Sequence, residues 1–219
     1  MKRSTFQLFR ESFPQIAFFV YVREMRDVLA DCRTCLDVGC GEDSPVRLLD
    51  FDYTVGLEGH QPTLERARAR GTHSEFSPGR VQDMGALFRP RQFDCVVALD
   101  LIEHLTKEDG LRLLRDMENI AAKKIVVFTP NGFLPQESRD GDLQEHLSGW
   151  EPLEMRSLGF RVIGMQGPKF LRGEYHEHRF RPKAISGILS VLGHYGYSRF
   201  RPEKAAAILC VKGVQKGVQ

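Results

Sequence analysis

Two acidic residues and two glycines near the start of the sequence stand in an order that suits a positively charged ligand. Asp37 directly precedes a loop that contains Gly39 and Gly41. Glu58 ends the next apolar run, about 20 residues further along the chain. The glycines allow the backbone to turn tightly and to approach a ligand. A carboxylate before such a loop attracts an ammonium or sulfonium group, and one at the end of the second strand can accept hydrogen bonds from both hydroxyls of a ribose. The pattern predicts a cationic ligand that carries a ribose.

The segment VQDMG, in which Asp83 ends the third expected strand, adds a site for a nucleobase. The Asp83 carboxylate can accept a hydrogen bond from the exocyclic amine of an adenine, and Met84 can lie against the ring. Adenine, ribose and a charged amino-acid tail together describe S-adenosylmethionine.

A dinucleotide is the alternative ligand for a glycine loop of this kind. The third glycine of the G-x-G-x-x-G fingerprint would stand at position 44, where the sequence has Ser44 followed by Pro45. Glu58 favours a nicotinamide-dependent oxidoreductase, whereas Asp37 and Ser44 oppose it.

Histidines supply the candidate groups for chemistry on the methyl acceptor. His104 in IEHL and His146 in QEHLSGW qualify by position as a general base, although His104 can also be a packing residue at a helix start. A base is optional, because methyl transfer is an in-line displacement at a carbon that a sulfonium already activates. His176 and His178 would face the same way on a strand, but no third ligand accompanies them at a convincing spacing. We therefore predict no metal site.

The elements that position these residues follow from hydrophobic periodicity. Short apolar runs alternate with helical segments, which is typical of a sheet wound with helices in right-handed β-α-β units. The expected strands are 35–39, 53–58, 74–83, 93–100, 124–130, 161–166 and 205–212, and the expected helices are 61–70, 107–122 and 150–159. Residues 6–31 are expected to form a helix or helix pair that packs on the sheet or covers a ligand.

The motifs LDVGCG, GLEGH, QDM and FDCVVALDLIEHL, in this order, resemble those of the class I S-adenosylmethionine-dependent methyltransferases. They are similar above all to the small-molecule group that includes quinone-biosynthesis methyltransferases. The resemblance covers about residues 33–166. It implies an α/β, Rossmann-like doubly wound sheet of seven mostly parallel strands, with an antiparallel last strand and helices on both faces. It also implies S-adenosylmethionine as cofactor and a methyl acceptor that offers an oxygen, nitrogen or carbon nucleophile. The cofactor-binding positions that it implies are Asp37, Gly39, Cys40, Gly41, Glu58, Gly59, Asp83, Met84, Leu99 and Asp100.

Length and composition favour one methyltransferase domain over residues 1–219. Its expected parts are an N-terminal helical segment (1–32), a cofactor-binding core (33–166), a substrate-side insertion (167–204) and a last strand with a tail (205–219). The insertion contains arginines that suit an anionic acceptor and the apolar run AISGILSVLGHYGY, which suits a lid or a partner helix. An ordinary solvated basic face over a packed helix explains the same residues.

The acceptor is expected to be a small molecule, apolar or anionic. A net charge of +2 gives no global field for nucleic acid, and LDLIEH replaces the Asn/Asp-Pro-Pro-aromatic motif of base-amine methyltransferases. The sequence shows no signal peptide or membrane span. Five scattered cysteines, including the C-x-x-C pair Cys32 and Cys35, indicate buried thiols and a cytoplasmic protein. A domain that binds S-adenosylmethionine without turnover remains a further alternative, and the oligomeric state is left open.

Overall fold

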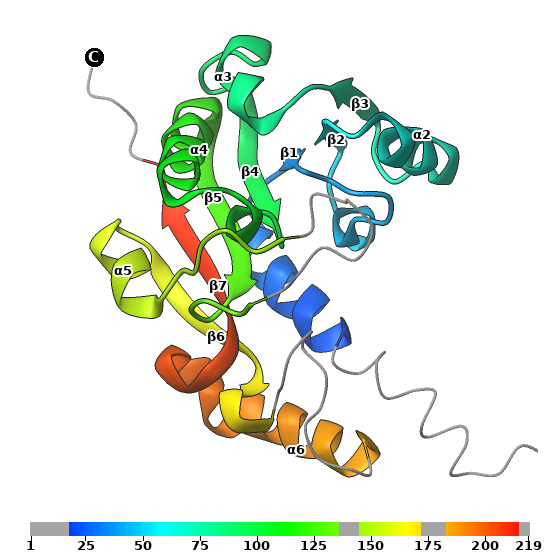
Figure 1. Cartoon of the computed structure of the whole chain (residues 1–219). Helices are drawn as coiled ribbons and strands as arrows, with labels where there is room; N and C mark the ends of the chain where they lie inside the picture. Colours follow the sequence, from blue (N-terminus) through cyan, green and yellow to red (C-terminus); the bar gives the residue numbers. More distant parts are fainter. Residues whose placement is uncertain (1–17, 136–144, 172–182, 215–219) are drawn as a thin grey trace, which may run out of the picture.

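The computed structural model describes residues 18–135, 145–171 and 183–214. In this part of the chain seven strands form one sheet in the order β3-β2-β1-β4-β5-β7-β6 (Figure 1). The strands are β1 (Thr34–Val38), β2 (Tyr53–Glu58), β3 (Glu75–Pro78), β4 (Phe93–Leu99), β5 (Ala121–Pro130), β6 (Arg161–Pro168) and β7 (Ala205–Gly213). β7 pairs antiparallel with both β5 and β6, and the other pairs of neighbouring strands are parallel. The predicted fold class is confirmed.

Helices and short 3-10 turns connect the strands. The helices are α2 (Gln61–Arg70), α3 (Met84–Leu87), α4 (Lys107–Ile120), α5 (Pro152–Ser157) and α6 (Lys183–Gly196), after a first helix that occupies residues 18–29. The strand order reverses between β1 and β4. In an open α/β sheet, ligands bind beyond the carboxyl ends of the strands at such a reversal. The loops after β1 and β4 are therefore placed to form a site.

Both faces of the sheet are buried. Along β4, Val96 and Ala98 belong to a core shared with α4, while Cys95 and Val97 belong to a second core shared with the first helix. This alternation follows from the two-residue period of a strand. Continuous apolar runs such as FDCVVAL are thus expected for a strand that is covered on both sides.

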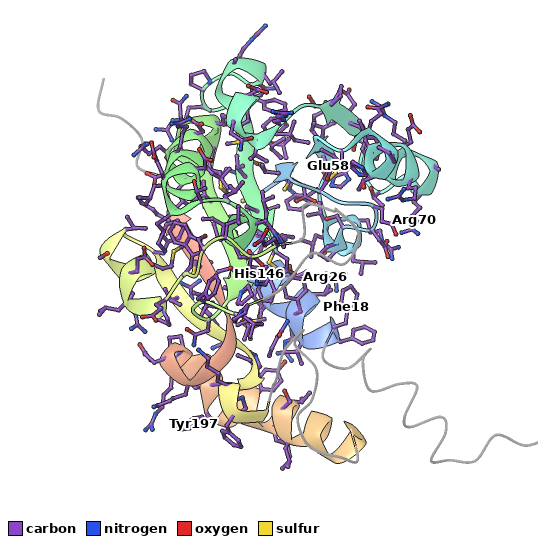
Figure 2. The ribbon with its side chains drawn as sticks, viewed as in Figure 1. Phe18, Arg26, Glu58, Arg70, His146 and Tyr197 are labelled. Carbon is purple, nitrogen blue, oxygen red and sulfur yellow. The ribbon has the colours of Figure 1, made fainter. Side chains whose placement is uncertain are left out.

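The first helix packs on the sheet through one face. Met25 is buried in the second core, and the Tyr21 ring meets the Phe128 ring edge-on at 4.7 Å between centroids. Phe18 and Phe19 at its start are exposed, as Figure 2 shows for Phe18. Packing on the sheet, one of the two roles predicted for residues 6–31, is observed for residues 18–29, whereas residues 6–17 lie outside the described part of the chain.

Two predicted helices are longer than those observed. α4 begins after Thr106, whose hydroxyl accepts a hydrogen bond from the Asp109 N–H at 3.2 Å, and it ends at Ile120 because β5 begins with the next residue. The helix predicted over 150–159 begins only at Pro152. Trp150 lies outside it, fully buried, with its indole N–H donating to the Ser148 hydroxyl at 3.0 Å.

The five cysteines are buried and free, as predicted. Burial raises the pKa of the Cys35 thiol, so the C-x-x-C pair has the character of core residues. Among the described helices, none combines the length and the apolar character that crossing a membrane requires.

Candidate active site at the carboxyl edge of the sheet

The loop after β1 closes on β2 through its backbone. The N–H groups of Gly39 and Cys40 both donate to the Leu57 carbonyl, at 2.8 and 3.1 Å. Gly39 and Gly41 have φ of +67° and +60°, which side chains rarely adopt. A Cβ on Gly39 would lie 2.7 Å from Leu101, whereas a Cβ on Gly41 would meet nothing within 4 Å. The loop is therefore packed at its first glycine and open at its second.

Asp37 lies beneath this loop and is almost fully buried. Its Oδ2 accepts hydrogen bonds from the Ser44 hydroxyl and from His73 Nε2, the latter at 3.1 Å. Ser44 also accepts from the Val46 N–H at 3.1 Å and caps the 3-10 turn η1 (Pro45–Leu48). The serine at the place of the third glycine is thus part of the carboxylate's support.

Glu58, at the end of β2, connects the two loops. Its Oε2 accepts from the Gly41 N–H at 3.1 Å, and its Oε1 accepts from the His60 N–H at 2.8 Å. The carboxylate is only partly buried, so solvent reaches it beside the open part of the glycine loop.

Side chains at the other predicted cofactor positions differ in accessibility. Asp83 and Gly59 are exposed and Leu99 is partly buried, as a surface site requires. The Cys40 side chain is buried and packs against Gly56: a Cβ added to Gly56 would lie only 2.8 Å from the Cys40 sulfur. A ligand in the loop would therefore meet the backbone of Cys40 and not its side chain. Met84 is fully buried in the core shared with α4. The Met84 side chain therefore packs in this core, and its predicted contact with an adenine ring stays a prediction.

Asp100 follows β4 with φ of +51°, and its N–H donates to the Phe128 carbonyl at 2.9 Å. Its side chain is reached by solvent but surrounded by protein, and the lost hydration raises its pKa to about 7. Burial also raises the pKa of Tyr21, and the charges of Asp100 and Asp37 add to this effect. The first helix therefore places a phenol near both predicted carboxylates.

Three side chains meet at the turn after Asp100. Glu103 lies in the 3-10 turn η3 (Ile102–His104), is 3% exposed, and accepts from the Thr129 hydroxyl at 3.0 Å. The rings of His104 and His146 meet edge-on with centroids 4.9 Å apart. The Leu147 and Ser148 N–H groups donate to the Glu103 carbonyl at 2.8 and 3.0 Å, which fixes the histidine-bearing segment on the turn.

The pKa values of this group follow from its burial. Burial raises the pKa of Glu103, and the charge of Asp100 raises it further. Burial lowers the pKa of His104, and the neighbouring His146 acts in the same direction. Figure 2 labels Glu58 and His146 on different parts of the molecule, since they follow strands on opposite sides of the reversal.

Residues 36–127 match the family model described as "Methyltransferase domain". This range contains the glycine loop, Glu58, Asp83 and the turn with Glu103 and His104. The chain carries a class I S-adenosylmethionine-dependent methyltransferase domain.

The methyltransferase domain has distant relatives in sequence and structure. A mouse protein described as "Probable tRNA methyltransferase 9B" is 24% identical over 143 residues, which are 65% of this chain and 30% of that protein. An Archaeoglobus fulgidus SAM-dependent methyltransferase has a TM-score of 0.59 at 16% identity, covering 96% of this chain and 100% of its own. A Thermotoga maritima SAM-dependent methyltransferase, titled a possible histamine N-methyltransferase, has a TM-score of 0.58 at 16% identity and covers 93% and 92%. These structures show the fold, and the chain spans about a third of the length of the curated relative.

The structure gathers the predicted methyltransferase site into two groups. Asp37, the glycine loop and Glu58 form one, and His104 with His146 form part of the other. Sequence reasoning missed His73, Tyr21 and Glu103, which come from elements far apart in the chain. A serine before a proline at a helix start was the available signal for the supporting role of Ser44. His176 and His178 lie outside the described residues.

Proposed function

We propose that the glycine loop, Asp37, Glu58 and Asp83 bind S-adenosylmethionine and that its methyl group passes to a small-molecule acceptor beside Asp100 and His146. The observation that carries this proposal is the hydrogen bond between the Gly41 N–H and the Glu58 carboxylate. It joins the open glycine of the first loop to the acid expected to hold the ribose, so one ligand can span both.

The charges on the donor side suit the cofactor. The buried Asp37 carboxylate supplies negative charge beneath the loop for the ammonium of the methionine part. Each oxygen of Glu58 accepts one backbone N–H, and a carboxylate oxygen has a second lone pair for a ribose hydroxyl. Asp83 is exposed and free to accept from the adenine amine.

In the reaction, a lone pair of the acceptor attacks the methyl carbon in line with the carbon–sulfur bond. The bonding pair stays on sulfur, the sulfonium becomes a neutral thioether, and the acceptor loses a proton if it had one. Holding the three atoms in line supplies much of the acceleration. Asp100 and Leu99 border the donor side of this path, and His104 with His146 border the acceptor side.

The charges on the acceptor side favour a small molecule over a polyanion. Within the described residues, no ion pair places a lysine or arginine on Asp100 or Glu103. Arg199, one of the arginines that suggested an anionic acceptor, instead donates to Glu24 at 2.7 and 3.0 Å. The exposed Phe133 and Leu147 neighbour the segments that hold His146, which favours an apolar acceptor.

Transfer RNA is the second candidate acceptor, and the mouse relative favours it. This chain, however, covers only 30% of that relative. Acids at the transfer site would repel a phosphate backbone, so we rank this acceptor below a small molecule.

Cofactor binding is tested with Asp37→Asn, Glu58→Gln and the matched control Glu65→Gln, an exposed carboxylate on α2 that accepts from Gln61. Calorimetric titration with S-adenosylhomocysteine should show roughly tenfold or greater weakening for the first two, because hydrogen bonds to charged groups contribute about 1.5–3 kcal/mol. Glu65→Gln should match the wild type. Wild-type affinity in folded Asp37→Asn and Glu58→Gln would contradict the site. If the wild type binds NAD in the same titration and does not bind S-adenosylhomocysteine, the oxidoreductase is favoured.

The acceptor class is tested with isotope-labelled S-adenosylmethionine offered to a low-molecular-mass metabolite fraction and, separately, to total RNA. We expect label in the small-molecule fraction. Label found only in RNA would replace the small-molecule proposal with the tRNA candidate.

A further inference from the structure

Glu103, His104 and His146 form a cluster of metal-ligand type beside the acceptor side of the site. One ligand atom from each lies within 4.8 Å of the ligand atoms of the other two. In a formed site, ligand atoms bound at about 2.1 Å lie roughly 3 to 4 Å apart. A small inward movement of the three side chains would complete the coordination.

The hydrogen bonds of both histidines fix the ring nitrogen that remains available. His104 Nδ1 lies 3.0 Å from the Glu145 carbonyl, and His146 Nδ1 lies 2.6 Å from the Leu134 carbonyl. A carbonyl can only accept, so Nδ1 carries the proton in each ring and Nε2 keeps its lone pair. Metal-binding histidines are oriented in this way by a backbone carbonyl behind the ring.

The glutamate has a similar arrangement. The Thr129 hydroxyl donates to Glu103 Oε2 at 3.0 Å, and this hydrogen bond orients the carboxyl group. Among the described ion pairs, none joins Glu103 or Asp100 to a basic side chain. A buried carboxylate without a cationic partner is costly, and a bound cation removes that cost.

We propose that Glu103, His104 and His146 bind a divalent first-row transition metal ion of the Zn²⁺ or Mn²⁺ type, which also binds the acceptor. Two imidazoles and one carboxylate are the ligands that these ions accept, whereas Mg²⁺ and Ca²⁺ prefer oxygen ligands. Three protein ligands leave positions open for a substrate atom. This role rests on the proposed function, because the cluster follows directly from the loop expected to border the methyl donor.

The ion would select an acceptor with a hydroxyl group. An oxygen bound to the metal loses its proton to water more easily, and its lone pair then displaces the methyl carbon from sulfur. The carbon–oxygen bond forms, the carbon–sulfur bond breaks with its electron pair left on sulfur, and no oxidant is needed. His104 and His146 serve as metal ligands in this assignment and not as general bases.

The test titrates the chelator-treated full chain with Co²⁺, a spectroscopic substitute for Zn²⁺. We expect one bound Co²⁺ per chain with visible absorption bands of nitrogen and oxygen ligation. Glu103→Gln, His104→Gln and His146→Gln should each weaken binding at least about tenfold. Two controls should bind like the wild type: His60→Gln, an exposed histidine on another loop, and the pair His176→Gln with His178→Gln.

A second measurement separates ligation from a structural role. Glu103→Gln keeps the size of the side chain and replaces a buried ionisable group by a neutral amide, so the melting temperature of the metal-free variant should equal or exceed that of the metal-free wild type. Added Co²⁺ should raise the melting temperature of the wild type and leave that of this variant unchanged. A metal-free variant that melts well below the wild type would assign Glu103 a packing role and overturn its place as ligand.

The remaining outcomes distinguish this inference from the proposed function. Thermal protection by S-adenosylhomocysteine without any specific Co²⁺ binding would overturn the metal site and leave the methyltransferase assignment standing. Stoichiometric Co²⁺ binding that depends on His146, without protection by S-adenosylhomocysteine, would support the metal site and reject the cofactor site. Co²⁺ binding lost only with the His176 and His178 substitutions would overturn the cluster.

Discussion

Ser44 replaces the third glycine of a dinucleotide loop with a side chain that holds the loop together. Its hydroxyl donates to the buried Asp37 carboxylate and accepts from the Val46 N–H, so one atom supports both the acid and the following turn. A glycine here would provide neither contact. The substitution that first argued against a dinucleotide is therefore a structural component of the alternative site.

Ser44→Ala should lower both stability and cofactor affinity. Removing the cap and one hydrogen bond to a buried carboxylate is expected to reduce the free energy of unfolding by about 1–2 kcal/mol. Denaturant unfolding checks the stability, and titration with S-adenosylhomocysteine checks the affinity. Ser157→Ala is the control, because that hydroxyl only donates to Glu154 in its own helix. Equal stability of Ser44→Ala and the wild type would contradict the supporting role.

At the scale of elements, a buried carboxylate connects the first helix to α6 and to the 3-10 turn that follows it. Glu24 is 2% exposed and accepts from Arg199, which lies in the 3-10 turn η6 (Ser198–Phe200), and its Oε1 is 3.5 Å from His194 Nε2 on α6. Burial alone would raise the pKa of Glu24, but the hydrogen bonds from His194 and Arg199 outweigh it and lower the pKa to about 2.

This depressed pKa makes the attachment of the first helix sensitive to acid. A carboxyl whose folded pKa lies below its unfolded value of 4.5 contributes stability that is fully present above that value. The contribution is lost as the pH falls from about 4.5 towards 2. We expect Glu24→Gln to flatten the fall in stability over this range and to lower stability at pH 7 by roughly 2–3 kcal/mol. Chemical unfolding of both proteins between pH 2 and 7 checks it, and parallel pH curves would refute the assignment.

Strands and connecting helices could be predicted from the sequence because their signals are local. β2 and α2 have the predicted bounds. An apolar run marks the limits of β2, and a proline near its first residue marks the start of α2. The start of α5 could not be predicted, because Trp150 lies outside the helix and its ring packs into the space that Gly110 on α4 leaves open. A Cβ on Gly110 would lie 2.4 Å from the Trp150 ring, and no local pattern shows that two residues 40 positions apart share one space.

The same limit applies to the site across the whole molecule. The proposed donor side consists mostly of successive strand ends, which the topology brings to one edge, so Asp37 and Glu58 could be selected as candidates from their spacing alone. The acceptor side depends on the approach of His146 to Glu103 and His104, which only tertiary structure creates. The burial of Met84 could not be predicted either, because an apolar residue next to a predicted ligand position is equally suited to the core.

A chain that ends at residue 204 should not give a stable monomer. β7 lies between β5 and β6 and pairs with both, so removing residues 205–219 leaves two unpaired strand edges in a sheet buried on both faces. Exposed edges of this kind promote aggregation. Size-exclusion chromatography of the truncated and full chains should show aggregated or unfolded truncated protein. A monomeric, cooperatively melting truncation would contradict this expectation.

The position of β7 between two strands that precede it in the chain also constrains how the protein is made. During translation, β1 to β6 leave the ribosome while the position between β5 and β6 is still empty. The nascent chain can form the half of the sheet with the glycine loop early, but the other half must wait until residues 205–213 have emerged. Synthesis of this protein therefore includes an interval in which the edge of an incomplete sheet can pair with other chains.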